Sequence, residues 1–325
     1  MTGRVQGRAN DRSQRRADDQ ARGRVVARFG QRYIVALSGT QGATSGGGGA
    51  AEVDAIGRGR RMEIVVGDRV RCSSEQRLHV IEVVEPRRNL LFRSDANRTK
   101  PLAANVDQIA IVFAAQPPPQ VEFVWRALLA ARAAGIQSVA ILNKIDLDSR
   151  GAQASLAEIE GLGARVLRVS ARADPVAARG LLEHECRDRA TLFVGQSGMG
   201  KSSLLNLLID AELRTGALSR RGTHGRQTTT ATRWFAYGKD GAVIDSPGFH
   251  EFGLAHLSAA QLTQWLPDFA AVTQACRFAD CRHAEEPDCG IRAAVEHGEI
   301  TRARYDFYRK LLAQDPGATV SRSRN

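Results

Sequence analysis

The chain has 325 residues, of which 43% are hydrophobic, and these values are typical of a globular protein with two or three domains. Its formal net charge of +11 at pH 7 and sequence pI of about 10.1 favour a polyanionic partner. We expect neither a secretory signal nor a membrane span, which excludes the secreted and membrane-embedded classes.

The N-terminal segment is basic. Residues 1–32 contain nine arginines against three aspartates, a net charge of +6. Residues 1–21 lack hydrophobic periodicity and predict a disordered basic arm, with a merely solubilising tail as the alternative.

Residues 22–97 have the pattern of short strands separated by turns. Five such runs are present, at 24–29, 33–37, 51–56, 65–72 and 78–84. Short strands at this spacing predict a small barrel of the oligonucleotide-binding (OB) type, which would bind RNA. Its arginines give either a nucleic-acid surface or a solvated face. They include Arg58, Arg60, Arg61, Arg87 and Arg88.

Residues 98–254 predict an α/β domain in which apolar strands end in polar loops. The run 138–142 is followed by the pattern N-K-x-D, with Asn143, Lys144 and Asp146 as its fixed positions. The Asp146 carboxylate can accept from the ring N–H and the exocyclic amino group of guanine, a donor pair that adenine lacks. Asn143 would brace the loop, and the stem of Lys144 would lie along the ring.

Two shorter motifs also follow predicted strands. Ser170 and Ala171 form an S-A turn, in which the Ala171 N–H would donate to guanine O6. Residues 245–248 form D-x-x-G, where Asp245 would hold Mg²⁺ through water and the Gly248 N–H would follow the γ-phosphate. Ligands bind at such strand ends in open α/β sheets.

A phosphate-binding P-loop is predicted between the strand 191–194 and the helix 203–208, because Gly195–Ser202 fits G-x-x-x-x-G-K-[ST]. Backbone N–H groups would cradle the phosphates, Lys201 would reach the β- and γ-phosphates, and Ser202 would bind Mg²⁺. The nucleotide-binding positions expected here are Gly195, Gln196, Ser197, Gly198, Met199, Gly200, Lys201, Ser202 and Ser203.

The order of these motifs is unusual. GTPases run from the P-loop to D-x-x-G and then to N-K-x-D and S-A, whereas here N-K-x-D and S-A precede the P-loop. The sequence therefore predicts a circularly permuted P-loop GTPase domain, since permutation is tolerated where chain termini lie close together.

Residues 255–325 predict a helical domain with a metal site. The pattern C-x₄-C-x-H-x₅-C suits one structural zinc ion in a cytoplasmic protein, and a disulfide pair is the alternative. Its ligands are Cys276, Cys281, His283 and Cys289. Cys72 and Cys186 are predicted to be packed apolar groups, and residues 291–295 and 305–312 to be helices.

The permuted motifs combined with the Cys/His pattern resemble the RsgA family, the circularly permuted GTPases of small-ribosomal-subunit biogenesis in bacteria. The resemblance implies an OB barrel, a permuted GTPase and a zinc domain. It also implies GTP hydrolysis to GDP, binding to the small subunit and its 16S rRNA late in maturation, and stimulation by the subunit. We expect a cytoplasmic monomer.

One position departs from the family pattern. Where the family commonly has G-x-H-T-T-T, residues 225–230 place Gln227 at the histidine. An amide can orient the attacking water, as glutamine does in Ras-like GTPases, so Gln227 is the predicted water-positioning residue and His224 the substitute. Thr229 is expected to complete the Mg²⁺ shell with Ser202. The predicted catalytic residues are Gln227, Lys201 and Asp245.

Two other functions remain open from the sequence. The chain could be an RNA-binding scaffold with a structural nucleotide site, or an ATP-dependent small-molecule kinase.

Overall fold

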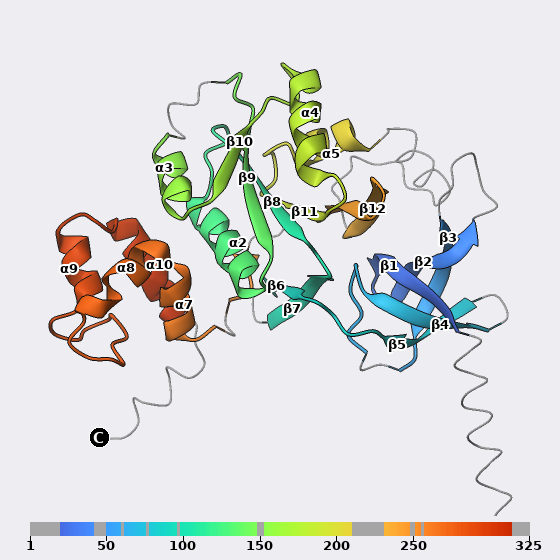
Figure 1. Cartoon of the computed structure of the whole chain (residues 1–325), viewed down its shortest axis with the longest axis horizontal. Coiled ribbons are helices and arrows are strands. Elements are labelled where there is room, and N and C mark those ends of the chain that lie inside the picture. The colour runs from blue at the N-terminus through green and yellow to red at the C-terminus, as the bar shows by residue number, and fades with distance from the viewer. Residues whose placement is uncertain are drawn as a thin grey trace, which may run out of the picture.

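The structure is a computed structural model that describes residues 20–41, 50–59, 62–75, 78–95, 98–147, 153–209, 231–247, 251–254 and 257–313. A β-barrel, a central sheet flanked by helices and a group of C-terminal helices follow one another along the chain (Figure 1). Most of the predicted basic arm lies outside the described residues. None of the helices in these ranges has both the length and the apolar character needed to cross a bilayer.

Five strands close the N-terminal barrel. They are β1 (Ala21–Phe29), β2 (Arg32–Gln41), β3 (Ala50–Gly57), β4 (Arg69–Glu75) and β5 (Leu78–Val84). The strands pair in the order β1-β2-β3-β5-β4, and β4 pairs again with β1. On β2, Tyr33, Val35 and Leu37 are buried and alternate with more exposed residues, as in a strand with one face on a core. The predicted OB-type barrel is confirmed.

The central sheet is mostly parallel. Its strands are β8 (Gln108–Ala114), β9 (Gln137–Asn143), β10 (Arg165–Arg168), β11 (Ala190–Val194), β12 (Arg233–Tyr237) and β13 (Gly241–Asp245). They are arranged β10-β9-β8-β11-β13-β12, and β12 is antiparallel to β13. Every residue of β8, β11 and β13 is buried, which is typical of parallel strands covered on both faces.

Helices cover the two faces of this sheet in pairs. These are α2 (Val121–Ala133), α3 (Gln153–Gly161), α4 (Pro175–Cys186) and α5 (Lys201–Leu208). Alternate residues of β8 point to opposite sides. Ile111 and Phe113 share a core cluster with residues of α2 and α3, whereas Ala110 and Val112 share one with residues of α4 and α5. The strand–helix order confirms the predicted permuted α/β domain.

The C-terminal helices pack on α2 and α3. They are α7 (Ala259–Trp265), α8 (Pro267–Val272), the 3₁₀ helix η2 (Thr273–Ala275), α9 (Gly290–Glu296) and α10 (Arg302–Ala313). Arg304 of α10 is 2% exposed, donates to Glu158 of α3 and to Asp268 of α8, and lies 4.5 Å from the ring of Trp125 on α2. A buried cation with two carboxylate partners thus fixes this domain to the central one.

A small sheet lies beside α2. It consists of β6 (Leu90–Asp95), β7 (Arg98–Ala104) and β14 (Glu251–Phe252), in the order β14-β6-β7. Phe252 is fully buried, and its ring lies 5.8 Å from that of Phe123 on α2. The chain is therefore anchored again at Phe252, seven residues after Asp245.

The barrel and the central sheet are continuous. β1 pairs with β12 at Ala27 and Arg233, and the Arg24 guanidinium lies 4.5 Å from the ring centre of Trp234 on β12. Asn105 donates to Gly67 O, and a Cβ at Gly67 would lie 2.0 Å from a backbone oxygen of β7. Such a close approach of two backbones requires glycine.

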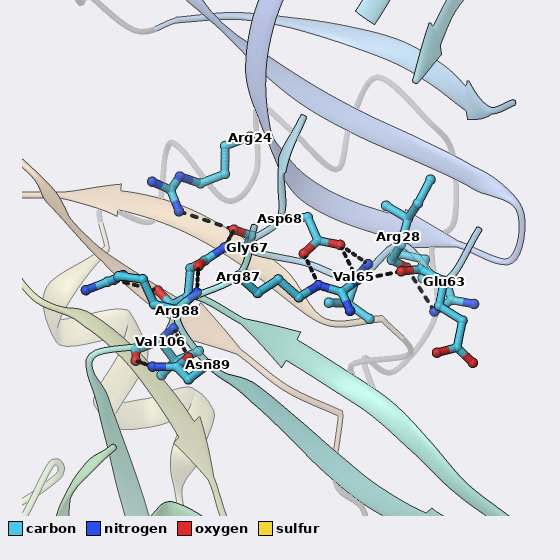
Figure 2. A network of polar contacts seen from close by, with 12 residues as sticks. Arg24, Arg28, Glu63, Val65, Gly67, Asp68, Arg87, Arg88, Asn89 and Val106 are labelled. Atoms are coloured by element: carbon cyan, nitrogen blue, oxygen red, sulfur yellow. Dashed lines mark hydrogen bonds and ion pairs between the residues drawn. The ribbon is translucent and has the colours of Figure 1, made fainter. Parts of the chain in front are cut away.

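Polar contacts fix the linker between the two domains (Figure 2). Asp68 is fully buried and accepts from Val65 N at 2.8 Å and from Arg87 Nε at 2.7 Å and Nη2 at 2.9 Å. Asn89 exchanges two hydrogen bonds with the backbone of Val106, at 2.8 and 2.9 Å. Because the buried Asp68 carboxylate is paired with Arg87 and fully hydrogen-bonded, these contacts stabilise the conformation of the linker.

We expect Arg87→Met to lower the free energy of unfolding by about 3 kcal/mol, because it leaves the Asp68 charge buried without its partner. Urea denaturation measures the loss. The control is Arg58→Met, which breaks the Arg58–Glu82 pair on a side chain that is 56% exposed and should cost less than about 1 kcal/mol. Equal losses in the two variants would contradict the assigned role of Asp68.

Candidate functional site

The predicted motifs meet at one edge of the central sheet. β9, β10, β11 and β13 are all parallel to β8 or to a neighbour of it, so their C-terminal ends share an edge. Asn143 ends β9, Gly195 follows β11 and Asp245 ends β13. β8 alone separates the N-K-x-D strand from the P-loop strand. The sheet therefore unites the motifs in spite of their inverted chain order.

The P-loop depends on glycine at two points. A Cβ at Gly195 would lie 2.4 Å from Val112 O, and one at Gly200 would lie 2.2 Å from Asn143 Nδ2. Gly200 also has a φ of +93°, and α5 begins directly after it. The loop consequently packs against β8 and Asn143 while its chain turns into the helix, the geometry that directs backbone N–H groups toward an anion.

Lys201 lies over the P-loop and donates from Nζ to Gly195 O at 3.1 Å. Burial lowers the pKa of Lys201, and the Asp245 carboxylate opposes that shift. Asp245 is 3% exposed, and the next residue, Ser246, donates from Oγ to Phe193 O at 2.8 Å. A cation and a carboxylate therefore flank the loop, which suits phosphate and its counter-ion. Ser202 and Ser203 are exposed at the start of α5.

Asn143 ties the N-K-x-D loop, the S-A turn and the P-loop together. Its Nδ2 donates to Met199 O of the P-loop at 3.1 Å, and its Oδ1 accepts from Ala171 N of the S-A turn at 3.1 Å. The side chain is 2% exposed, so both bonds are shielded from water. The sequence predicted that Asn143 braces the loop, and the structure extends that brace to all three motifs.

The carboxylate that was predicted to read guanine is accessible. Asp146 is exposed and accepts a hydrogen bond from Ser170 Oγ, which itself accepts from Ala173 N at 3.0 Å. These contacts orient Asp146. The Ala171 N–H, expected to meet guanine O6, donates here to Asn143.

The remaining predicted residues of the site, Gln227, Thr229 and Gly248, lie outside the described residues. One element of the site was missed. The segment 115–120 between β8 and α2 was not assigned to the site from the sequence, yet it contacts both Lys144 and Gln196. The sequence could have indicated this segment, because it follows the C-terminal end of a predicted parallel strand, where ligands bind.

The Cys/His cluster assembles as predicted. The candidate ligand atoms of Cys276, Cys281, His283 and Cys289 all lie within 4.8 Å of one another. His283 Nδ1 is 3.5 Å from the sulfurs of both Cys276 and Cys289. All five cysteines are free thiols. Four ligands around zinc, with sulfurs at about 2.3 Å from the ion, require this spacing, so the donor set fits a tetrahedral metal ion.

Contacts with α10 hold the backbone of the metal loop. Tyr305 donates from its hydroxyl to His283 O at 2.8 Å, and Arg309 donates to Ala284 O at 2.8 Å. Glu286 accepts from the N–H groups of Arg282, Ala284 and Glu285. Burial raises the pKa of Glu286, but these backbone donors outweigh it and bring the pKa to about 2. His283 has a φ of +59°, which these bonds maintain.

Comparison with known proteins agrees with this geometry. Residues 84–255 match the sequence model of the family described as RsgA GTPase. The chain is 43% identical over 311 residues to a protein of Paraburkholderia phymatum named small ribosomal subunit biogenesis GTPase RsgA, covering 94% of this chain and 93% of that protein. A protein of the same name from Paraburkholderia xenovorans is 42% identical over 303 residues, with coverages of 90% and 93%.

Two solved structures share the fold. The crystal structure of YjeQ from Thermotoga maritima has a TM-score of 0.64 and 26% identity, covering 91% of this chain and 98% of that one. YloQ, described as a circularly permuted GTPase, has a TM-score of 0.61 and 23% identity, with coverages of 94% and 97%. The second likeness concerns the fold alone.

Thiol titration tests the metal site. Burial raises the pKa of Cys72 to about 11 and that of Cys186 to about 12, so at pH 8 both stay protonated and unreactive toward a thiol reagent. We expect no rapid reaction of the native metal-loaded protein. A strong chelator should remove the metal and open the metal loop, so that its three cysteines react, while Cys72 and Cys186 stay protected inside the barrel and the central domain.

If the number of reactive cysteines is the same before and after chelation, the cluster holds no metal. A count of five would show that the barrel and the central domain open together with the metal loop.

Proposed function

The chain belongs to the RsgA GTPase family and is a GTP hydrolase, and from this membership we propose that it acts as a switch in late maturation of the small ribosomal subunit. It would bind the subunit and its 16S rRNA, hydrolyse GTP to GDP and phosphate when stimulated by the subunit, and then dissociate. The names of the relatives support the subunit as partner. The observation that supports a single guanine-nucleotide site within this proposal is the contact of Asn143 with both the S-A turn and the P-loop.

We assign the guanine to the N-K-x-D and S-A loops. Asp146 would accept from the two guanine donors, and the Ala171 N–H would be shared between Asn143 and guanine O6. Residues 195–203 would hold the phosphates. The short links between these loops would keep base and phosphates in one site. A scaffold with a structural nucleotide site would need the same geometry, so only turnover separates the two functions.

Hydrolysis would follow from positioning and charge neutralisation. The water oxygen attacks the γ-phosphorus, the bond to the bridging oxygen breaks, and GDP leaves. Lys201 would stabilise the charge on the β- and γ-phosphates, and Gln227 would orient the water. Mg²⁺ would supply further charge neutralisation, held by Ser202 and Thr229 directly and by Asp245 through water, and the Gly248 N–H would follow the γ-phosphate.

The distribution of charge indicates which parts meet rRNA. Residues 255–325 contain nine basic and nine acidic residues, so the net charge of +11 resides entirely in residues 1–254. We therefore propose that the arm, the barrel and the central domain make most of the phosphate contacts.

We propose four functional segments with the boundaries expected from the sequence. They are a basic arm at 1–21, an RNA-binding OB domain at 22–97, the permuted GTPase at 98–254 and a C-terminal domain at 255–325. The metal of the last domain would be one structural Zn²⁺, because protein ligands fill all four positions. We place the protein in the cytoplasm as a monomer.

Nucleotide hydrolysis with purified small subunits tests the function. We expect turnover of GTP and not of ATP, with stimulation by the subunits. Asp146→Asn should weaken GTP binding about 100-fold and gain xanthosine triphosphate, because the amide turns one acceptor into a donor. Asp240→Asn, at an exposed turn, is the matched control and should change neither preference. Preferential turnover of ATP would favour a kinase, and binding without turnover a scaffold.

The role of Gln227 is tested in the same assay. Gln227→Ala should reduce subunit-stimulated kcat about 100-fold, the effect of losing one group that positions a proton-transferring water, with little change in GTP affinity. His224→Ala should keep its rate. If kcat falls in His224→Ala and is unchanged in Gln227→Ala, His224 orients the water instead.

A further inference from the structure

The loop between β8 and α2 touches the nucleotide site from both sides. It spans residues 115–120, contains Pro117, Pro118 and Pro119, and is called the proline loop below. It belongs to none of the motifs that identify a GTPase. It leaves β8, the strand that lies between the N-K-x-D strand and the P-loop strand, at the edge where both of those loops emerge.

The base-reading side grips the start of the proline loop. Lys144 Nζ donates to Gln116 O at 2.9 Å. Lys144 has a φ of +62° and directly follows Asn143, so its stem is fixed at both ends. The proline loop thereby sets the path of the side chain that is assigned to lie along the guanine ring.

The phosphate side grips the end of the same loop. Gln196 is the first variable position of the P-loop, and its Oε1 accepts from Gln120 N at 3.1 Å. Gln120 provides no side-chain cap for α2, so Gln196 satisfies a backbone donor at the N-terminus of that helix. A Cβ at Gly198 would lie 3.7 Å from the Pro117 ring, which is van der Waals contact.

The proline loop is stiff and firmly anchored. Its three prolines restrict φ. Beyond it, α2 is held by the C-terminal helices, because the rings of Trp125 and Phe307 lie 5.2 Å apart and Glu122 pairs with Lys310 at 2.5 Å. Because the proline loop joins the buried strand β8 to the packed helix α2, it can act as a spacer of fixed length.

We propose that the proline loop is a positioning element that fixes the spacing between the base-reading loop and the P-loop, with Gln196 as its positioning residue on the phosphate side. This inference rests on the proposed guanine site. Its consequence is specific. A change in the phosphate loop should loosen recognition of the base, because Asp146 and the P-loop can no longer engage one nucleotide at the same time in the best geometry.

The test compares GDP with inosine diphosphate (IDP), which carries the same phosphates but lacks the exocyclic amino group that Asp146 would read. Calorimetry on the full-length protein gives the two affinities and their ratio. Gln196→Met preserves the size of the side chain and removes the acceptor. We expect it to weaken GDP binding and to reduce the GDP-to-IDP preference about tenfold, the worth of one misaligned hydrogen bond.

Two further variants separate positioning from folding. Gln196→Glu keeps an acceptor and should restore the preference, while Gln137→Met, at the exposed start of β9, should leave it at the wild-type value. Thermal unfolding checks that each variant is folded. If Gln196→Met weakens GDP and IDP equally, Gln196 serves only the shape of the P-loop and the proposal fails. If the wild-type protein shows no preference for GDP, guanine recognition itself is refuted.

Discussion

The nucleotide site depends on one buried amide. Asn143 uses its donor on the P-loop and its acceptor on the S-A turn, each at 3.1 Å, while its own backbone belongs to the N-K-x-D loop. Three loops from three strands therefore share a single side chain that water does not reach. Gly200 is tied to the same constraint, since any larger residue there would collide with the amide. Because the loops are fixed to one another, cutting and rejoining the chain elsewhere leaves the site intact.

Buried charges attach the flanking domains to the central one. Asp68 and Arg87 fix the barrel, and Arg304 fixes the C-terminal helices to α2 and α3. Breaking such a pair lowers the stability of the fold, because the remaining charge is left buried without a partner. The barrel, the central domain and the metal loop are therefore held in a defined relation. Along the sequence, the net positive charge lies in residues 1–254 and not in the C-terminal domain.

Several features could be predicted from the sequence because they depend on nearby residues. The five-strand barrel followed from turns at short intervals, the P-loop from its glycines and lysine, and the metal cluster from four ligands within fourteen residues, Cys276 to Cys289. The contact of Ala171 N–H with Asn143 was not expected, because it depends on how β9 and β10 pair in register. The positions of Gln227, Thr229 and Gly248 stay predictions, since they lie outside the described residues.

The sequence by itself determined which chemical groups the site can offer, since the carboxylate proposed for guanine, the lysine proposed for phosphate and the thiols of the metal cluster are properties of residue types at fixed spacing. Only the tertiary structure decided which of these groups meet. It placed β8 between the two halves of the site, drew the proline loop into contact with both, and joined β1 to β12 in one sheet. The physical reason is that such contacts link residues tens to hundreds of positions apart, and packing and strand register, rather than local pattern, select them.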